Sequence, residues 1–80
     1  MVRETVTEID LLKAMNVELL RHDACDICHF WQVQRVPLAV EDGCNWAGAS
    51  LKCTAATAVD CYPGANKVIA RARERYNLQA

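Results

Sequence analysis

The chain has 80 residues, of which 52% are hydrophobic and 24% are charged, and its formal net charge is −1. This length, with few Gly and Pro residues, predicts one small folded domain over residues 1–80 and excludes a disordered chain. The small net charge gives no global attraction to nucleic acid or to an anionic membrane, so we do not expect direct nucleic-acid contact. No apolar run reaches the roughly 20 residues of a membrane-spanning helix, and the first residues do not form a signal peptide, so we predict a cytoplasmic protein without a membrane partner.

An amphipathic helix is predicted to begin near Thr5 and to end near His22. Thr5 and Glu8 have capping-box spacing, and Thr7 is a competing N-cap. At roughly 100° per residue the apolar side chains fall on one stripe, which indicates a helix that packs on a core. That stripe consists of Val6, Ile9, Leu12, Met15, Leu19 and Leu20.

Two extended segments, Cys28 to Val36 and Trp46 to Cys53, are predicted to pair as an antiparallel hairpin. The first segment alternates apolar and polar residues, which places Trp31 and Val33 on one face of a half-buried strand. The second segment is a weaker strand, because its Ala content also favours a helix over residues 47–60. A loop with Pro and Gly joins the two segments.

A second amphipathic helix is predicted after Asp60, which can cap it, with Pro63 in its first turn. Asn77 is predicted to end this helix in a left-handed conformation. The apolar stripe of the helix consists of Cys61, Ala65, Val68, Ile69, Ala72 and Tyr76. Its opposite, charged face consists of Lys67, Arg71, Glu74 and Arg75.

The order helix, strand, strand, helix predicts an α+β fold with an αββα layout around a two-stranded antiparallel hairpin. The simplest packing places both helices on one face of the hairpin and leaves the other face open to solvent or to a partner. Charge is uneven along the chain: residues 1–66 carry five basic and nine acidic residues, whereas residues 67–76 carry four basic residues and one acidic residue.

The five cysteines, Cys25, Cys28, Cys44, Cys53 and Cys61, are predicted to be mostly reduced in the cytoplasm. Their odd number also argues against a fully paired disulfide framework. A cysteine thiol without a reactive role behaves as a small buried hydrophobe. We therefore interpret the last three cysteines as core residues.

The first two cysteines belong to a Cys-x-x-Cys-His motif that ends at His29, which is the spacing for covalent haem attachment. The methionines both precede the motif, and His22 is the one other histidine, so a minimal c-type haem protein is a minor alternative. Cys25 and Cys28 also supply half of a structural zinc site, which makes a zinc-stabilised binding module the main alternative hypothesis. The remaining ligands would come from His22, His29, Cys44, Cys53 or Cys61.

Groupings typical of a catalytic site are not found in the sequence. Ser50 is not part of a G-x-S-x-G motif, and the three glycines are too scattered for a phosphate-binding loop. His22 and His29 are the candidate bases, and no acid follows either at a recognisable spacing. We therefore predict a protein that is not an enzyme and that needs no cofactor.

Two groups of residues are candidates for binding a larger partner, because Trp and Arg are enriched at the energetic centres of interfaces. For both groups a structural alternative exists: a charged helix face is commonly just solvated, and Trp31 and Trp46 can stack as core residues. The group on the hairpin consists of Trp31, Gln32, Gln34 and Arg35, and the group on the last helix consists of Lys67, Arg71 and Arg75.

Short motifs mark the junctions of the predicted elements along most of the chain: Cys25, Asn45-Trp46, Cys61 and Arg75-Tyr76-Asn77-Leu78. This pattern resembles short αββα proteins of unknown function from bacterial genomes and prophages, although Cys28, Cys44 and Cys53 do not belong to it. Small phage proteins of this kind are often binders that block a host machine, anti-CRISPR proteins among them. The resemblance implies an inhibitor that binds a larger protein or ribonucleoprotein, such as a host nucleic-acid-targeting complex.

Overall fold

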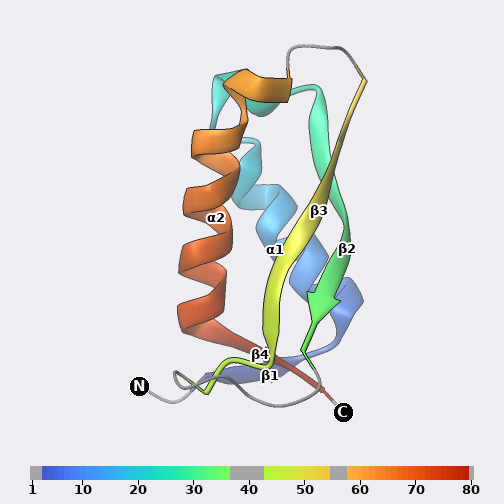
Figure 1. Cartoon of the computed structure of the whole chain (residues 1–80), viewed down its shortest axis with the longest axis vertical. Helices are drawn as coiled ribbons and strands as arrows, with labels where there is room; N and C mark the ends of the chain where they lie inside the picture. Colours follow the sequence, from blue (N-terminus) through green and yellow to red (C-terminus); the bar gives the residue numbers. More distant parts are fainter. Residues whose placement is uncertain (1–2, 37–42, 55–57, 80) are drawn as a thin grey trace.

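The computed structural model describes residues 3–36, 43–54 and 58–79. In chain order these residues form β1 (Glu4–Val6), α1 (Glu8–Leu19), the 3-10 turn η1 (Asp23–Cys25), β2 (Cys28–Arg35), β3 (Trp46–Cys53), the 3-10 turn η2 (Ala58–Asp60), α2 (Tyr62–Arg75) and β4 (Tyr76–Leu78). The β2–β3 hairpin runs alongside both helices, while β1 and β4 lie together at the end where the chain begins and finishes (Figure 1).

The β2–β3 hairpin confirms the predicted antiparallel pair and the α+β class. Its register runs from Cys28 opposite Cys53 to Arg35 opposite Trp46, which agrees with the two predicted segments. The competing helix over residues 47–60 is wrong for its first half, because those residues pair with β2. Phe30, Val33 and Trp46 are buried and give the hairpin its apolar face.

The helix α1 is rotated from the predicted orientation. Its buried line is Leu11, Met15 and Leu19, whereas Ile9 and Leu20, which were assigned to the core stripe, are each 66% exposed. The rotation follows from a polar contact at Asn16, because its side chain bonds the backbone of β2 and so fixes which face turns inward.

The first helix also begins later than the capping-box spacing predicted. Thr7 is the N-cap, and its hydroxyl accepts a hydrogen bond from the Asp10 amide at 3.1 Å. Thr5 lies instead in β1, so the predicted box between Thr5 and Glu8 does not form. Thr7, the alternative to Thr5, is therefore the confirmed N-cap.

The apolar stripe predicted for α2 is confirmed. Cys61, Ala65, Val68 and Ala72 are buried, and proline occupies the first turn as expected. The other two members of the predicted stripe are half-buried: Ile69 lies in α2, whereas Tyr76 lies in β4 rather than in the helix. The predicted cap at Asp60 is wrong, because that residue belongs to η2 and Cys61 takes the N-cap position without a side-chain hydrogen bond.

The parallel pair of β1 and β4 was not predicted. Glu4 lies opposite Tyr76 and Val6 opposite Leu78, and the Gln79 amide donates to the Val6 carbonyl at 2.9 Å. The chain therefore leaves α2 directly as a strand, with Tyr76 at φ −132° and ψ 144°. The left-handed helix end predicted at Asn77 is wrong, since a backbone partner in β1 favours an extended conformation there.

Two disulfides join the elements at the opposite end of the molecule. Cys25 bonds Cys61, and Cys28 bonds Cys53, with Cα–Cα separations of 4.9 and 4.0 Å. The expectation of mostly reduced cysteines is therefore wrong in this structure. Cys61 is a core residue as predicted, and Cys53 packs against the core half-buried, but both are in disulfides rather than free thiols. The hairpin register accounts for the second pair, because it places Cys28 directly opposite Cys53. Cys44 is a buried thiol, as predicted, and donates to the Trp46 carbonyl at 3.3 Å.

Within residues 3–36, 43–54 and 58–79, no helix is both long enough and apolar enough to cross a membrane.

Candidate interaction surfaces

Trp31 is the large aromatic residue that the hairpin leaves exposed. Its side chain is 54% exposed, whereas Trp46 is fully buried and donates its indole N–H to the Tyr76 carbonyl at 3.1 Å. The prediction that at least one tryptophan is a core residue is confirmed for Trp46. The prediction that Trp31 and Val33 share a face is wrong, because Val33 is buried.

A β-bulge explains why Trp31 is exposed. The register shifts between Phe30 and Gln32, so Trp31 is the extra residue on β2. Phe30 and Val33 are three positions apart, and regular alternation would place them on opposite faces. The bulge lets both of them face the core and turns Trp31 outward.

The contact between α1 and β2 holds the strand next to this bulge. The Asn16 side chain donates to the Phe30 carbonyl at 3.1 Å and accepts from the Phe30 amide at 2.7 Å. These two bonds hold the backbone of Phe30 in place, and Phe30 immediately precedes Trp31. The backbone position from which the exposed indole extends is therefore held by α1.

The other predicted hairpin residues are also exposed. The Gln34 amide donates to the Ser50 hydroxyl at 3.5 Å, and Gln32 lies opposite Ser50 in the register. Arg35 is partly engaged within the chain, because its guanidinium lies 3.7 Å from the Glu8 carboxylate and donates to the Gln79 carbonyl at 3.1 Å.

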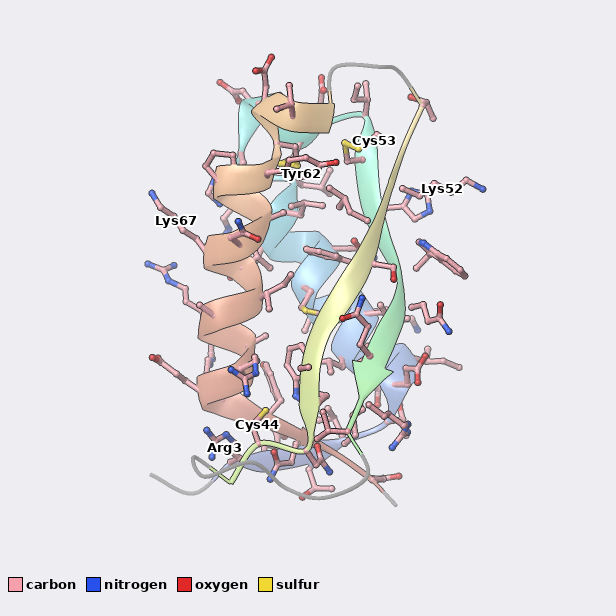
Figure 2. All side chains as sticks on the ribbon, in the orientation of Figure 1. Arg3, Cys44, Lys52, Cys53, Tyr62 and Lys67 are labelled. Carbon is pink, nitrogen blue, oxygen red and sulfur yellow. A yellow bond between two sulfur atoms is a disulfide. The ribbon has the colours of Figure 1, made fainter. Side chains whose placement is uncertain are left out.

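Lys52 and His29 extend this surface and were missed as partner-binding candidates, although His29 was considered as a base and as a metal ligand. They are opposite each other in the register and both are exposed. Figure 2 shows Lys52 pointing away from the two helices. Alternation of inward and outward residues along β3 could have identified Lys52 as exposed, but this pattern is weak in a strand rich in Ala and Gly. We define the open face as the exposed hairpin residues His29, Trp31, Gln32, Gln34 and Lys52. Arg35 is exposed but lies at its edge, opposite the buried Trp46 and paired with Glu8 of α1.

The second predicted group lies on α2, where Lys67 points outward from the helix (Figure 2). Arg71 and Arg75 border a hollow of about 300 Å³ between α1 and α2. The guanidinium of Arg75 lies over the Tyr76 ring, 5.7 Å from its centroid. The hollow is lined by Ala14, Met15, Val17, Glu18, Val68, Arg71, Ala72, Arg75 and Tyr76.

The predicted metal ligands Cys25 and Cys28 are both held in disulfides, which removes the thiolates that zinc or haem attachment needs. Among the residues that the structure describes, no group of three or more His, Cys, Asp or Glu side chains could hold a metal ion. Zinc ligation therefore stays a prediction for the reduced chain.

The motifs that carry the resemblance are bonded to one another. Cys25 and Cys61 form one disulfide, Asn45 bonds Leu78, and Trp46 bonds Tyr76. These residues join the hairpin and α2 to other parts of the chain, so they account for the fold rather than for a binding surface.

Comparison with known proteins gives no match to a family model, to a curated protein or to a solved structure. The function is therefore inferred from the residues of this chain.

Proposed function

We propose that this chain is a non-enzymatic interaction module that covers a functional surface of a larger protein or ribonucleoprotein through its open face. One observation carries the proposal: a bulge holds Trp31 out in solvent while the neighbouring Phe30 and Val33 are buried. Exposing an indole in water forgoes hydrophobic stabilisation, and a partner that buries it would recover that free energy.

The surroundings of Trp31 have the composition of a protein interface. Amide side chains at Gln32 and Gln34 and the cation of Lys52 provide polar groups around an aromatic anchor. Interfaces commonly place an aromatic hot spot within such a polar rim. In the part of the chain that the structure describes, the indole N–H of Trp31 has no hydrogen-bond acceptor, so it is available to a partner.

The test is partner capture with a matched aromatic control. The disulfide-intact wild type, a Trp31→Ala variant and a Tyr62→Ala variant would each be crosslinked in a bacterial lysate, and retained proteins would be quantified by mass spectrometry. Tyr62 is a suitable control because it is 51% exposed at the start of α2, away from the open face. The proposal expects a protein retained by the wild type and by Tyr62→Ala but lost with Trp31→Ala. Equal retention by all three chains would contradict it.

A narrower version of the proposal makes the partner a host nucleic-acid-targeting complex, as the resemblance implies. Such a complex works in the cytoplasm, where thiols are kept reduced, whereas disulfides persist in oxidising compartments. The two disulfides thus favour an oxidising compartment, and the narrower version requires the reduced chain to keep its fold. Inhibition of reconstituted target cleavage by the chain, measured with and without reductant, tests this version. No inhibition under either condition would rule it out.

A zinc-stabilised module is the second candidate, and the arrangement of the cysteines favours it. Cys25 and Cys28 are three positions apart, so the disulfides to Cys61 and Cys53 leave from neighbouring points of the chain. Reduction would release four thiols at one end of the molecule, which is a ligand set for structural zinc. Native mass spectrometry of the reduced chain with added zinc tests this candidate. One bound zinc and unfolding by a chelator would support it, and the bare chain mass would exclude it.

A further inference from the structure

We infer that the hollow between α1 and α2 is a second binding site, which accepts an acidic amphipathic segment of a protein partner. The inference concerns a different surface from the open face and does not depend on it. It rests on the apolar floor of the hollow, on the cations along one rim and on the size of the space.

The floor of the hollow is apolar. Met15 from α1 and Val68 and Ala72 from α2 are buried there, and together they form the base of the space. On the α1 rim, Val17 is 60% exposed although it lines the hollow. An apolar side chain placed between the helices would cover Val17 and remove it from water.

The α2 rim is cationic. Arg71 and Arg75 line the hollow and are four residues apart, so they lie along one side of the helix. Lys67 is on the same side one turn earlier, outside the lining. Within the described ranges, none of them has an acidic partner. Like charges at this spacing destabilise a helix, and a bound carboxylate would relieve that repulsion.

Glu18, the acidic residue that lines the hollow, is already paired with an arginine. The Glu18 carboxylate lies 3.5 Å from the Arg21 guanidinium, one turn along α1. The hollow therefore presents uncompensated positive charge to a ligand. Arg75 is also oriented by the Tyr76 ring beneath it, which leaves the N–H groups at the edge of its guanidinium available for bidentate contact with a carboxylate.

The size of the hollow favours a side chain of a partner over a larger ligand. About 300 Å³ is at the lower limit of small-molecule pockets, which commonly span roughly 300–1,000 Å³. A groove between two helices suits an amphipathic segment that inserts one apolar side chain. Charge then selects the segment: acidic residues beside the apolar anchor pair with Arg71 and Arg75, and basic residues are repelled.

The test is selection from a displayed library of random peptides on the disulfide-intact wild-type chain. Affinities of the enriched peptides would be measured against the wild type, against Arg71→Glu/Arg75→Glu and against Lys13→Glu/Lys52→Glu. The last variant makes the same change in net charge at two exposed positions that do not line the hollow. Trp31→Ala is measured in parallel to separate this site from the open face, and circular dichroism confirms that each variant is folded.

The inference expects enriched peptides in which Asp or Glu adjoins an apolar residue. We expect these peptides to bind Arg71→Glu/Arg75→Glu at least about tenfold more weakly than the wild type and to bind the other two variants within about twofold of it. Peptides without acidic enrichment, equal loss in both charge-reversed variants or an empty selection would overturn the inference. Loss of binding with Trp31→Ala alone would assign the peptides to the open face, and would overturn this inference while supporting the proposed function.

Discussion

Asn45 and Leu78 exchange two hydrogen bonds that join the hairpin to the C-terminal strand. The side-chain Nδ2 of Asn45 donates to the Leu78 carbonyl at 2.8 Å, and the backbone N–H of Leu78 donates to the side-chain Oδ1 of Asn45 at 2.9 Å. Asn16 makes the same pair of bonds with Phe30 on β2. Each asparagine thus satisfies one donor and one acceptor of a strand as a neighbouring strand would.

We predict that Asn45→Ala lowers the free energy of unfolding by about 2 kcal/mol, because the Leu78 amide and carbonyl both lose a partner in a partly buried position. Urea denaturation of the two proteins measures the change. Asn45→Asp is the contrast: it keeps the acceptor for the Leu78 amide but turns a carboxylate oxygen toward the Leu78 carbonyl, so it should cost at least as much as the alanine. A change below about 0.5 kcal/mol in Asn45→Ala would show that water replaces both bonds.

We predict that the effect of Gly64→Ala depends on His22. A Cβ at Gly64 would lie 2.9 Å from Cγ and Nδ1 of His22, which is too close without a shift of the imidazole. Gly64→Ala should therefore destabilise the wild type. In a His22→Ala background the same substitution should stabilise α2 by about 0.5–1 kcal/mol, because alanine favours a helix. Thermal unfolding of the four proteins gives the coupling energy, and stabilisation in both backgrounds would show that the imidazole yields freely.

We predict that Cys25→Ser/Cys61→Ser lowers the free energy of unfolding by about 3–4 kcal/mol, because this disulfide restricts the unfolded chain between residues separated by 36 positions. Removing the other disulfide, with a separation of 25, should cost slightly less. Denaturation with and without reductant provides the measurement on the wild type. An unfolding midpoint that reductant does not change would mean that the cysteines contribute no stability as disulfides.

We predict that replacing Trp46 lowers the free energy of unfolding strongly, whereas replacing Trp31 leaves it nearly unchanged. Trp31→Ala should change the free energy of unfolding by no more than about 0.5 kcal/mol, since its side chain is mostly in solvent. Trp46→Ala should cost about 3–5 kcal/mol, since it empties a fully buried site and removes the bond to Tyr76. Chemical denaturation compares them directly, and a large loss in Trp31→Ala would contradict its role as an exposed anchor.

Local sequence pattern was sufficient for some parts of the structure. Alternation indicated the first strand of the hairpin, and spacings of three and four residues identified the buried side of α2 through Ala65, Val68 and Ala72. These features depend only on residues close together in the sequence, so a short stretch of sequence is enough to predict them.

Other parts depend on contacts between distant residues. The orientation of α1 is set by the hydrogen bonds between Asn16 and Phe30 of β2. The exposure of Trp31 follows from a β-bulge, which no short sequence motif predicts. Cysteine pairing is also not contained in spacing, because several connectivities fit the same sequence. The two candidate surfaces were thus predicted by residue type, while their geometry required the assembled fold.

The pairing of β1 with β4 has a consequence for how the chain is made. β1 leaves the ribosome before its partner, Tyr76–Leu78, and the hairpin and both helices are made between them. Closing a loop of this length is the most non-local step in the fold and is favoured only after nearer contacts exist. We therefore expect β1 to pair with β4 only after the elements between them have formed.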